Sequence, residues 1–465
     1  MAAALEVTDA LAEWVGRQRW FVGKDAKPSL RRVASIDLHE DPLVRVSIAI
    51  VEDRTEAPTV VYQVPVVLRR VPVDAQNSGF IGTVSDDAGD TWHVYDGPRD
   101  PAFTRRLAEV IADGESCGAG AASLRGIPVS PWPAGMTSTV LGGEQSNTSI
   151  VYSPGGDDPY RTSVICKLFR MLHDGENPDV VLQSALFGAG SKSVPELFGS
   201  VVGEWPDETR AGDTGEPGRA TGHLAFAQRF LTGAVDAWGL ALAAGATLSD
   251  FTASARQIGI ATADVHATLA AALPTREAGE SDIRDIVAAW RARRDAAIVE
   301  VPELAPLRES IEILYERASR VPWPRLQRIH GDLHLGQVLA GAGDTWAIID
   351  FEGEPLRPLA DRCLPDLPLR DIAGMLRSFD YAAGAQASSA GVAEWAHACR
   401  AAFVDGYIDR SERDVRRNRV LLDAFELDKA LYEVVYEARN RPSWLPIPTM
   451  AVHRITDRVD VSQGR

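Results

Sequence analysis

The chain has 465 residues, of which 45% are hydrophobic, 24% charged and 7% aromatic. It is about three times as long as one ordinary domain and has a globular composition, so we expect two or three lobes and exclude a disordered, fibrous or disulfide-framework chain. The net charge of -17 argues against a nucleic acid or an anionic membrane as partner, because both attract basic surfaces.

Three further features predict a cytoplasmic protein. The first fifteen residues include acidic side chains and lack the basic start of a secretory signal. No apolar run approaches the length of a membrane span. The four cysteines show no paired metal-binding spacing. We therefore expect a soluble protein in a reducing compartment.

The first part of the chain, residues 1–110, favours a small sheet that forms a cap. A helix-like aromatic start at 11–21 precedes runs that are rich in β-branched residues and separated by polar turns. These predicted strands cover 29–38, 43–51 and 59–71.

The second part, residues 111–234, has the pattern of a β-rich lobe with one helix, which we expect at 177–188. Polar insertions at 153–162 and 205–221 are typical of exposed hairpin loops. The predicted strands cover 142–152, 163–170, 196–204 and 224–231.

The third part, residues 235–465, changes to helical spacing of its apolar residues. Only 327–350 interrupts this pattern, with two short strand-like stretches around a polar loop. The predicted helices cover 248–273, 283–297, 306–319, 369–383, 393–410 and 416–439. The fold class is therefore α+β, with a cap, a β-rich lobe and a helical lobe.

The polar loop in the helical lobe carries the strongest chemical signal. Asp332 lies between apolar stretches, where a carboxylate can accept a hydroxyl proton, and Gln337 follows five residues later. Asp350 ends the next apolar stretch before Phe351. Each aspartate alone could be an ordinary loop or strand-end carboxylate. Together they match the protein-kinase arrangement of an aspartate, an amide and a second aspartate that bind magnesium and phosphates.

The β-rich lobe offers groups for phosphate. Lys167 is a charged residue inside an apolar strand run, as expected of a lysine that reaches phosphates, although an edge-strand lysine has the same pattern. The loop 142–149 joins two strands with small and hydroxyl side chains. It contains neither common glycine-rich phosphate motif, so by itself it could be a polar turn.

Several segments resemble the aminoglycoside-phosphotransferase-like branch of the kinase superfamily and, within it, actinobacterial maltokinases. They are Gln18–Phe21, Glu144–Ser149, His330–Gln337, Asp350–Pro355, Leu369–Ala383 and Arg441–Pro448. The resemblance implies a bilobal protein-kinase-like fold behind an N-terminal cap. It also implies ATP- and Mg2+-dependent phosphorylation of maltose to maltose 1-phosphate for α-glucan synthesis, and association with trehalose synthase.

The resemblance also assigns roles. Asp332 would be the base or orienting group for the sugar hydroxyl, Gln337 and Asp350 the Mg2+ ligands, and Lys167 an ATP phosphate contact. The phosphate loop would be Gln145, Ser146, Asn147, Thr148 and Ser149, and the adenine hinge Gln228, Arg229 and Phe230. The chain departs from the family at Leu367, where a serine is usual, and at Val181, where a helix glutamate usually pairs with the lysine. At the second position, either Glu176 or Asp179 substitutes, or Lys167 is held otherwise.

The acceptor site is predicted on the helix at 423–439. A stripe of two tyrosines, carboxylates and a lysine suits stacking on a sugar and hydrogen bonds to it, although a solvated face with ion pairs has the same spacing. The candidate sugar-binding residues are Lys429, Tyr432, Glu433, Tyr436, Arg439 and Trp444. Two other functions remain open: a kinase of another sugar or aminoglycoside, such as glucosamine, and a non-catalytic kinase-like scaffold.

Overall fold

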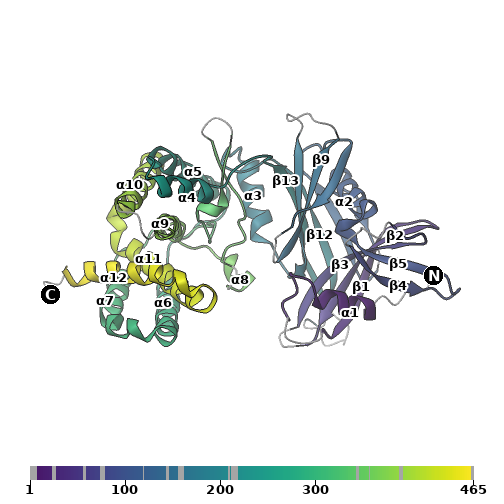
Figure 1. Ribbon diagram of the computed structural model, residues 1–465, viewed down its shortest axis with the longest axis horizontal. Coiled ribbons are helices and arrows are strands. Elements are labelled where there is room, and N and C mark those ends of the chain that lie inside the picture. Colours follow the sequence, from purple (N-terminus) through teal and green to yellow (C-terminus); the bar gives the residue numbers. More distant parts are fainter. Residues whose placement is uncertain are drawn as a thin grey trace. The chain divides into compact units, whose positions relative to one another are not determined.

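The computed structural model divides the chain into two compact units. One contains residues 1–180 and 196–232, here called the N-unit, and the other contains residues 181–195 and 233–465, here called the C-unit. Figure 1 shows the strands of the N-unit and the helices of the C-unit. The structure describes residues 8–23, 28–55, 59–73, 79–118, 120–142, 146–155, 162–207, 210, 218–341, 345–354, 357–386 and 391–461.

The first sheet of the N-unit is antiparallel, with strand order β1-β2-β3-β5-β4, and β11 pairs with β3. It confirms the three strands predicted for the cap. The elements are α1 (Thr8–Gly16), β1 (Leu30–Glu40), β2 (Val44–Asp53), β3 (Val60–Arg69), β4 (Phe80–Ser85), β5 (Thr91–Asp96) and β11 (Met171–Leu172).

Helix α2 (Pro101–Asp113) follows this sheet and was not predicted. Its start has two ordinary signals, because the Asp100 side chain accepts a hydrogen bond from the Ala102 N–H and Pro101 is the first helical residue. It ends at Gly114, whose φ of +66° is in the left-handed region that glycine tolerates.

The second sheet has the order β6-β7-β12-β13-β10-β9-β8, and its neighbours are antiparallel. The loop predicted at 205–221 is partly wrong, since Trp205 pairs with Ala220 inside the sheet and both are buried. The strands are β6 (Ser116–Cys117), β7 (Ser123–Pro128), β8 (Met136–Val140), β9 (Asn147–Pro154), β10 (Ser163–Phe169), β12 (Leu197–Asp207) and β13 (Gly218–Phe230).

The two sheets of the N-unit share one hydrophobic core. Ile36 and Ile48 of the first sheet belong to the same buried cluster as Ile150 and Leu168 of the second sheet and Leu107 of α2. The boundary predicted at residue 110 therefore does not divide the core, and the three-part division of the chain stays a prediction.

The C-unit is mainly helical, and its sheet, β14 and β15, is the two-stranded interruption that the sequence predicts. Helix α3 begins in the N-unit and continues in the C-unit. Helices α4 and α12 were not predicted. The elements are α3 (Pro178–Gly188), α4 (Ala237–Thr247), α5 (Thr252–Ala272), α6 (Glu280–Glu300), α7 (Arg308–Arg320), β14 (Val338–Ala340), β15 (Trp346–Ile348), α8 (Leu359–Arg362), α9 (Leu369–Gly384), α10 (Val392–Ser411), α11 (Arg419–Asn440) and α12 (Pro446–Val461).

Helix α9 lies within the C-unit core, with most of its residues buried. Within the described part of the chain, no helix has both the length and the apolar character that crossing a membrane requires.

Candidate active site

Asp371, on α9, holds the backbone of the predicted catalytic loop. Its carboxylate oxygens accept hydrogen bonds from the backbone N–H groups of His330 and Gly331, each at 2.8 Å. His266 Nε2 also lies 2.9 Å from Asp371 Oδ2, the oxygen that accepts from His330, and His266 Nδ1 lies 2.9 Å from the Tyr407 hydroxyl. Burial raises the pKa of Asp371, but the hydrogen bond with His266 and the electrostatic effects of His266 and His330 outweigh it and hold the pKa below its usual range. Asp371 is thus an ionised anchor inside the core.

Two more contacts bring α9 against the loop. The Ser378 hydroxyl accepts a hydrogen bond from the Leu335 N–H at 3.1 Å. Gly374 permits the close approach, because a Cβ at this position would lie 2.5 Å from the Leu333 carbonyl oxygen. Helix α9, which lies in a segment that the resemblance marked, therefore supports the loop.

Asp332 forms an ion pair with Lys429 of α11. The Lys429 Nζ lies 2.8 Å from Asp332 Oδ1 and 3.7 Å from Glu354 Oε1. Burial raises the pKa of Asp332, but Lys429 and His334 lower it by more, so the pKa lies below its usual range. Burial lowers the pKa of Lys429, but Asp332 and Glu354 outweigh it and raise the pKa. Both partners are therefore charged at neutral pH, and Asp332 can accept a proton.

The two predicted metal ligands lie together. Gln337 ends the 3-10 turn Leu335–Gln337, and its Nε2 donates to Asp350 Oδ2 at 3.0 Å. His330 Nε2 lies 2.9 Å from the Ile349 carbonyl oxygen, which ties the loop to the end of β15. The amide oxygen and the carboxylate are hard donors of the kind that Mg2+ prefers, so the pair fits this ion. Their role as ligands stays a prediction.

Aromatic and positive side chains gather beside Lys429. Its Nζ lies 4.8 Å from the Tyr432 ring centroid, and the Arg293 guanidinium carbon lies 5.5 Å from the same centroid. The rings of Tyr432 and Tyr436 stack with centroids 6.5 Å apart. Three of the predicted sugar-binding residues, Lys429, Tyr432 and Tyr436, thus share one stripe of α11.

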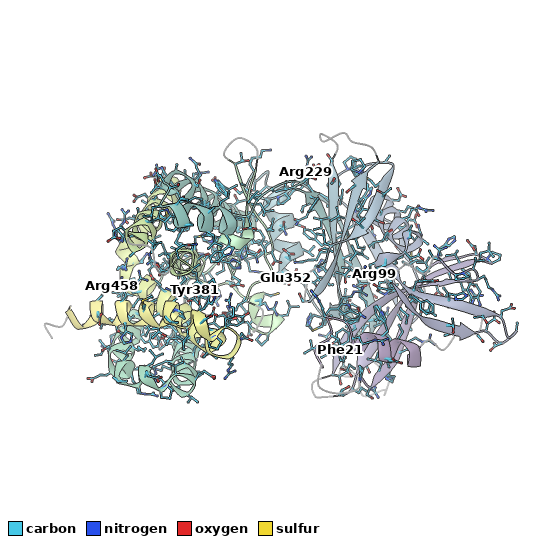
Figure 2. All side chains as sticks on the ribbon, in the orientation of Figure 1. Phe21, Arg99, Arg229, Glu352, Tyr381 and Arg458 are labelled. Carbon is cyan, nitrogen blue, oxygen red and sulfur yellow. The ribbon has the colours of Figure 1, made fainter. Side chains whose placement is uncertain are left out.

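The other predicted sugar-binding residues have different surroundings. Glu433 is buried and accepts from Arg377 Nε at 2.9 Å. Trp444 stacks on Tyr381 with ring centroids 6.1 Å apart, and Figure 2 labels Tyr381 on α9. Arg439 is exposed and forms an ion pair of 2.7 Å with a carboxylate on α6. A sugar-binding role for all six residues stays a prediction.

In the N-unit, Lys167 pairs with Asp179. The Nζ lies 3.0 Å from Asp179 Oδ2, and the Asp179 side chain is 2% exposed. Asp179 stands two residues before Val181, and Glu176 is exposed. Of the alternatives that the sequence left open, Asp179 therefore supplies the carboxylate for the lysine.

The predicted phosphate loop is described in part, since Gln145 lies outside the described residues. Ser146 is exposed and Asn147, Thr148 and Ser149 begin β9. The Thr148 hydroxyl accepts from the Nε of Arg170 at 2.8 Å, and the fully buried Arg170 also donates to Asp96 at 3.0 Å. The Arg170 guanidinium carbon lies 4.9 Å from the Trp20 ring centroid. Residues near the N-terminus thus help to hold this strand.

The predicted hinge forms the end of β13. Gln228 is opposite Ile165 of β10, and Phe230 is opposite Ser163. Arg229, labelled in Figure 2, forms an exposed ion pair with Glu196. Contact between these residues and adenine stays a prediction.

Sequence reasoning missed several supporting residues. Asp371 and Glu354 lie inside segments that the resemblance had marked, so a signal for both was present. His266 and Arg293 lie on helices α5 and α6, far from the loop in sequence, and nothing in their own helices distinguishes them. Only the packing of α5 and α6 in the C-unit reveals their contacts.

Two parts of the chain match known protein families. Residues 14–100 match the maltokinase N-terminal cap domain, and residues 210–417 match the phosphotransferase enzyme family. Residues 210–417 therefore belong to the phosphotransferase enzyme family. The chain is 27% identical to a glucosamine kinase of Mycolicibacterium smegmatis over 68% of this chain and 78% of the relative. It is 30% identical to a glucosamine kinase of Streptacidiphilus jiangxiensis over 49% of this chain and 57% of the relative.

Solved structures confirm the predicted fold of this chain. A glucosamine kinase in complex with glucosamine, ADP and inorganic phosphate aligns over 96% of this chain and 98% of that chain, with a TM-score of 0.66 and 21% identity. A second crystal form of glucosamine kinase gives a TM-score of 0.68 over 96% of this chain and 99% of that chain, also at 21% identity. The kinase-like arrangement of a β-rich N-terminal part and a helical C-terminal part is therefore shown.

Proposed function

We propose that this phosphotransferase transfers the γ-phosphoryl group of ATP to the anomeric hydroxyl of maltose and forms maltose 1-phosphate. The observation that carries the proposal is the Asp332–Lys429 ion pair on the loop that α9 anchors. It keeps a carboxylate ionised beside the aromatic stripe of α11, where a sugar hydroxyl can present its proton.

In this mechanism, Asp332 accepts the hydroxyl proton as the sugar oxygen bonds to the γ-phosphorus. The bond from that phosphorus to the bridging oxygen breaks, and ADP leaves with the electron pair. Lys167, oriented by Asp179, contacts an ATP phosphate, while residues 145–149 and 228–230 take the phosphate-loop and hinge roles. Gln337 and Asp350 would hold Mg2+, which supplies charge neutralisation for the phosphates when it is bound.

One observation favours maltose as the acceptor. The cap at residues 14–100 matches the domain described for maltokinases.

Glucosamine is the second candidate acceptor. It rests on the likeness of this chain to glucosamine kinases in both sequence and fold. Association with trehalose synthase and a place in α-glucan synthesis are further proposals from the maltokinase resemblance.

The experiment is a substrate panel. Purified protein is incubated with ATP and Mg2+ and with maltose, glucose, glucosamine or kanamycin, ADP release is measured, and 31P NMR identifies the phosphorylated carbon. We expect the highest kcat/KM for maltose and an anomeric phosphate. Turnover of glucosamine without turnover of maltose would establish the second candidate, and no turnover of any acceptor would support the non-catalytic scaffold.

A further inference from the structure

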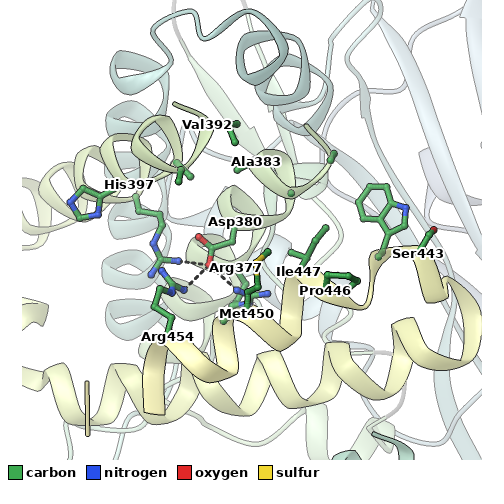
Figure 3. Close-up of a pocket in the computed structure, with 17 residues that line it drawn as sticks. Arg377, Asp380, Ala383, Val392, His397, Ser443, Pro446, Ile447, Met450 and Arg454 are labelled. Atoms are coloured by element: carbon green, nitrogen blue, oxygen red, sulfur yellow. Dashed lines mark hydrogen bonds and ion pairs between the residues drawn. The ribbon is translucent and has the colours of Figure 1, made fainter. Parts of the chain in front are cut away.

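Two adjoining hollows open on the helical C-unit. The smaller, of about 450 Å³, is here called the basic hollow, and every ionisable side chain that lines it in the described chain is basic. These side chains are His397, Arg400, Arg416, Arg419, Arg454 and Arg458. Figure 3 shows the larger hollow, of about 730 Å³, which shares His397, Arg400 and Arg454 and has an apolar wall that includes Ile447 and Met450 of α12.

Two carboxylates, one of them fully buried, hold the arginines between the two hollows. Glu426 of α11 is fully buried and accepts from Arg400 at 2.8 Å and from Arg454 at 2.6 Å. Asp380 of α9 accepts from Arg400 at 3.0 Å, from Arg454 at 2.7 Å and from Arg377 at 2.7 Å. Burial raises the pKa of Glu426, but the arginines outweigh it and lower the pKa to about 2. This network is therefore charged at neutral pH.

The rest of the basic hollow has fewer acidic partners than basic groups. Asp423 serves both Arg419, at 2.8 Å, and Arg458, at 2.7 Å, while Arg416 pairs with Asp405. Among the described residues, the five lining arginines thus pair with four carboxylates, of which Asp380 also pairs with Arg377, so the arginines outnumber their acidic partners. The Nε of Arg458, a residue labelled in Figure 2, is buried and has no hydrogen-bond partner among the described residues.

We propose that the basic hollow binds a small phosphate monoester and regulates the phosphotransferase. Guanidinium groups present planar pairs of N–H donors that match phosphate oxygens, and each arginine has five such donors, of which the ion pairs use only some. Because the whole chain has a net charge of -17, its general surface does not attract anions. A concentration of five arginines in one concave site is therefore a specific anion site.

The structure also gives a route from this hollow to the catalytic loop. Glu426 lies one helical turn before Lys429 on α11, so an anion that draws arginines away from Glu426 acts on the helix that pairs with Asp332. Asp380 lies on α9, two residues after Ser378, which holds the loop backbone. Both helices that contribute carboxylates to the arginine network thus position catalytic groups.

The test uses glucose 1-phosphate as the probe and glucose as its neutral analogue, at constant ionic strength. Isothermal titration calorimetry on the full chain should show saturable binding of glucose 1-phosphate. In the double variant Arg416→Gln/Arg458→Gln, we expect this binding to weaken by about 10-fold or more, since two phosphate-facing charges are lost. The exposed neighbour Arg417, which does not line the hollow, gives the matched control Arg417→Gln, whose affinity should equal that of the unaltered protein.

Activity provides the second readout. Glucose 1-phosphate should change KM or kcat for the sugar acceptor in the unaltered protein and in Arg417→Gln, but not in the double variant. Equal affinity in all proteins would place the phosphate at another site and overturn the proposal, as would an absence of saturable binding. If binding depends on the arginines but glucose 1-phosphate has no kinetic effect, the anion site is confirmed and the proposed regulation is overturned. Arg416→Lys/Arg458→Lys keeps both charges and should retain part of the binding, which separates charge loss from misfolding.

Discussion

The ammonium of Lys429 lies 2.8 Å from the carboxylate oxygen of Asp332, although the two residues are 97 positions apart in the chain. Lys429 also contacts the Tyr432 ring, so one side chain joins the predicted base to the predicted acceptor stripe. The first two predictions separate the roles of these partners.

Asp332→Asn should lower kcat by about 10²- to 10⁴-fold, because an amide cannot accept the hydroxyl proton. ATP binding should change little, since Asp332 is not among the predicted nucleotide contacts. Steady-state kinetics together with calorimetric titration of ATP measure both effects. Retained turnover would remove Asp332 from the role of base.

Lys429→Gln should shift the pH dependence of kcat/KM. Lys429 lowers the pKa of Asp332, so the ionised base is present above that pKa and is lost as the pH falls through it. Without the ammonium, the pKa of Asp332 rises, and the acid limb of the profile should move to higher pH. Lys192→Gln, which removes an exposed lysine of the C-unit, is the control and should leave the limb in place. An unshifted limb in Lys429→Gln would show that another group sets it.

Asp179→Asn should impair ATP use, because Lys167 loses its charged partner. Because a hydrogen bond between charged groups contributes more free energy than a neutral one, we expect its loss to raise KM for ATP by about 10-fold. Asp179→Glu should restore part of the loss, and Glu176→Gln should have little effect, since Glu176 is exposed. If Glu176→Gln were the more damaging change, the assignment of Asp179 as the partner of Lys167 would be wrong.

Asp371→Asn should destabilise the protein by about 1–3 kcal/mol at neutral pH, because a buried amide cannot replace all the hydrogen bonds that the carboxylate accepts. The pKa of Asp371 is depressed in the folded state, so its contribution is complete above the ordinary aspartate pKa and is lost as the pH falls through the folded value. Urea unfolding at several pH values should therefore show the difference between variant and parent shrinking in acid. The exposed Asp361→Asn is the control and should unfold like the parent at every pH.

The sequence predicted the parts of the fold that local pattern determines. Strands β1, β2, β3, β9, β10, β12 and β13, in whole or in part, and the long helices α5, α6, α9, α10 and α11 follow apolar periodicity, which neighbouring residues determine. Helices α4 and α12 were not predicted. Helix α4 is apolar on all sides, so it lacks an amphipathic pattern, and α12 begins within a proline-rich segment that favours a turn.

Some residues of the candidate site could likewise be predicted from local sequence, and others could not. Asp332, Gln337 and Asp350 could be found from spacing and resemblance because they lie within one short stretch of chain. The partners His266 and Arg293 could not, since their contacts depend on how α5 and α6 pack. Val181 indicated that the glutamate expected to pair with Lys167 is absent, but only the structure shows that Lys167 pairs with Asp179.

The common core of the two N-unit sheets limits how the cap can be exchanged or removed. Leu38, Val46 and Val67 of the first sheet pack in the same cluster as residues of the second sheet, so a chain shortened to begin after residue 100 would expose apolar side chains to water. Such a chain would be prone to aggregate rather than act as an uncapped kinase. The cap and the second sheet thus form one folding unit, so an exchanged cap would have to preserve the apolar side chains of this shared cluster.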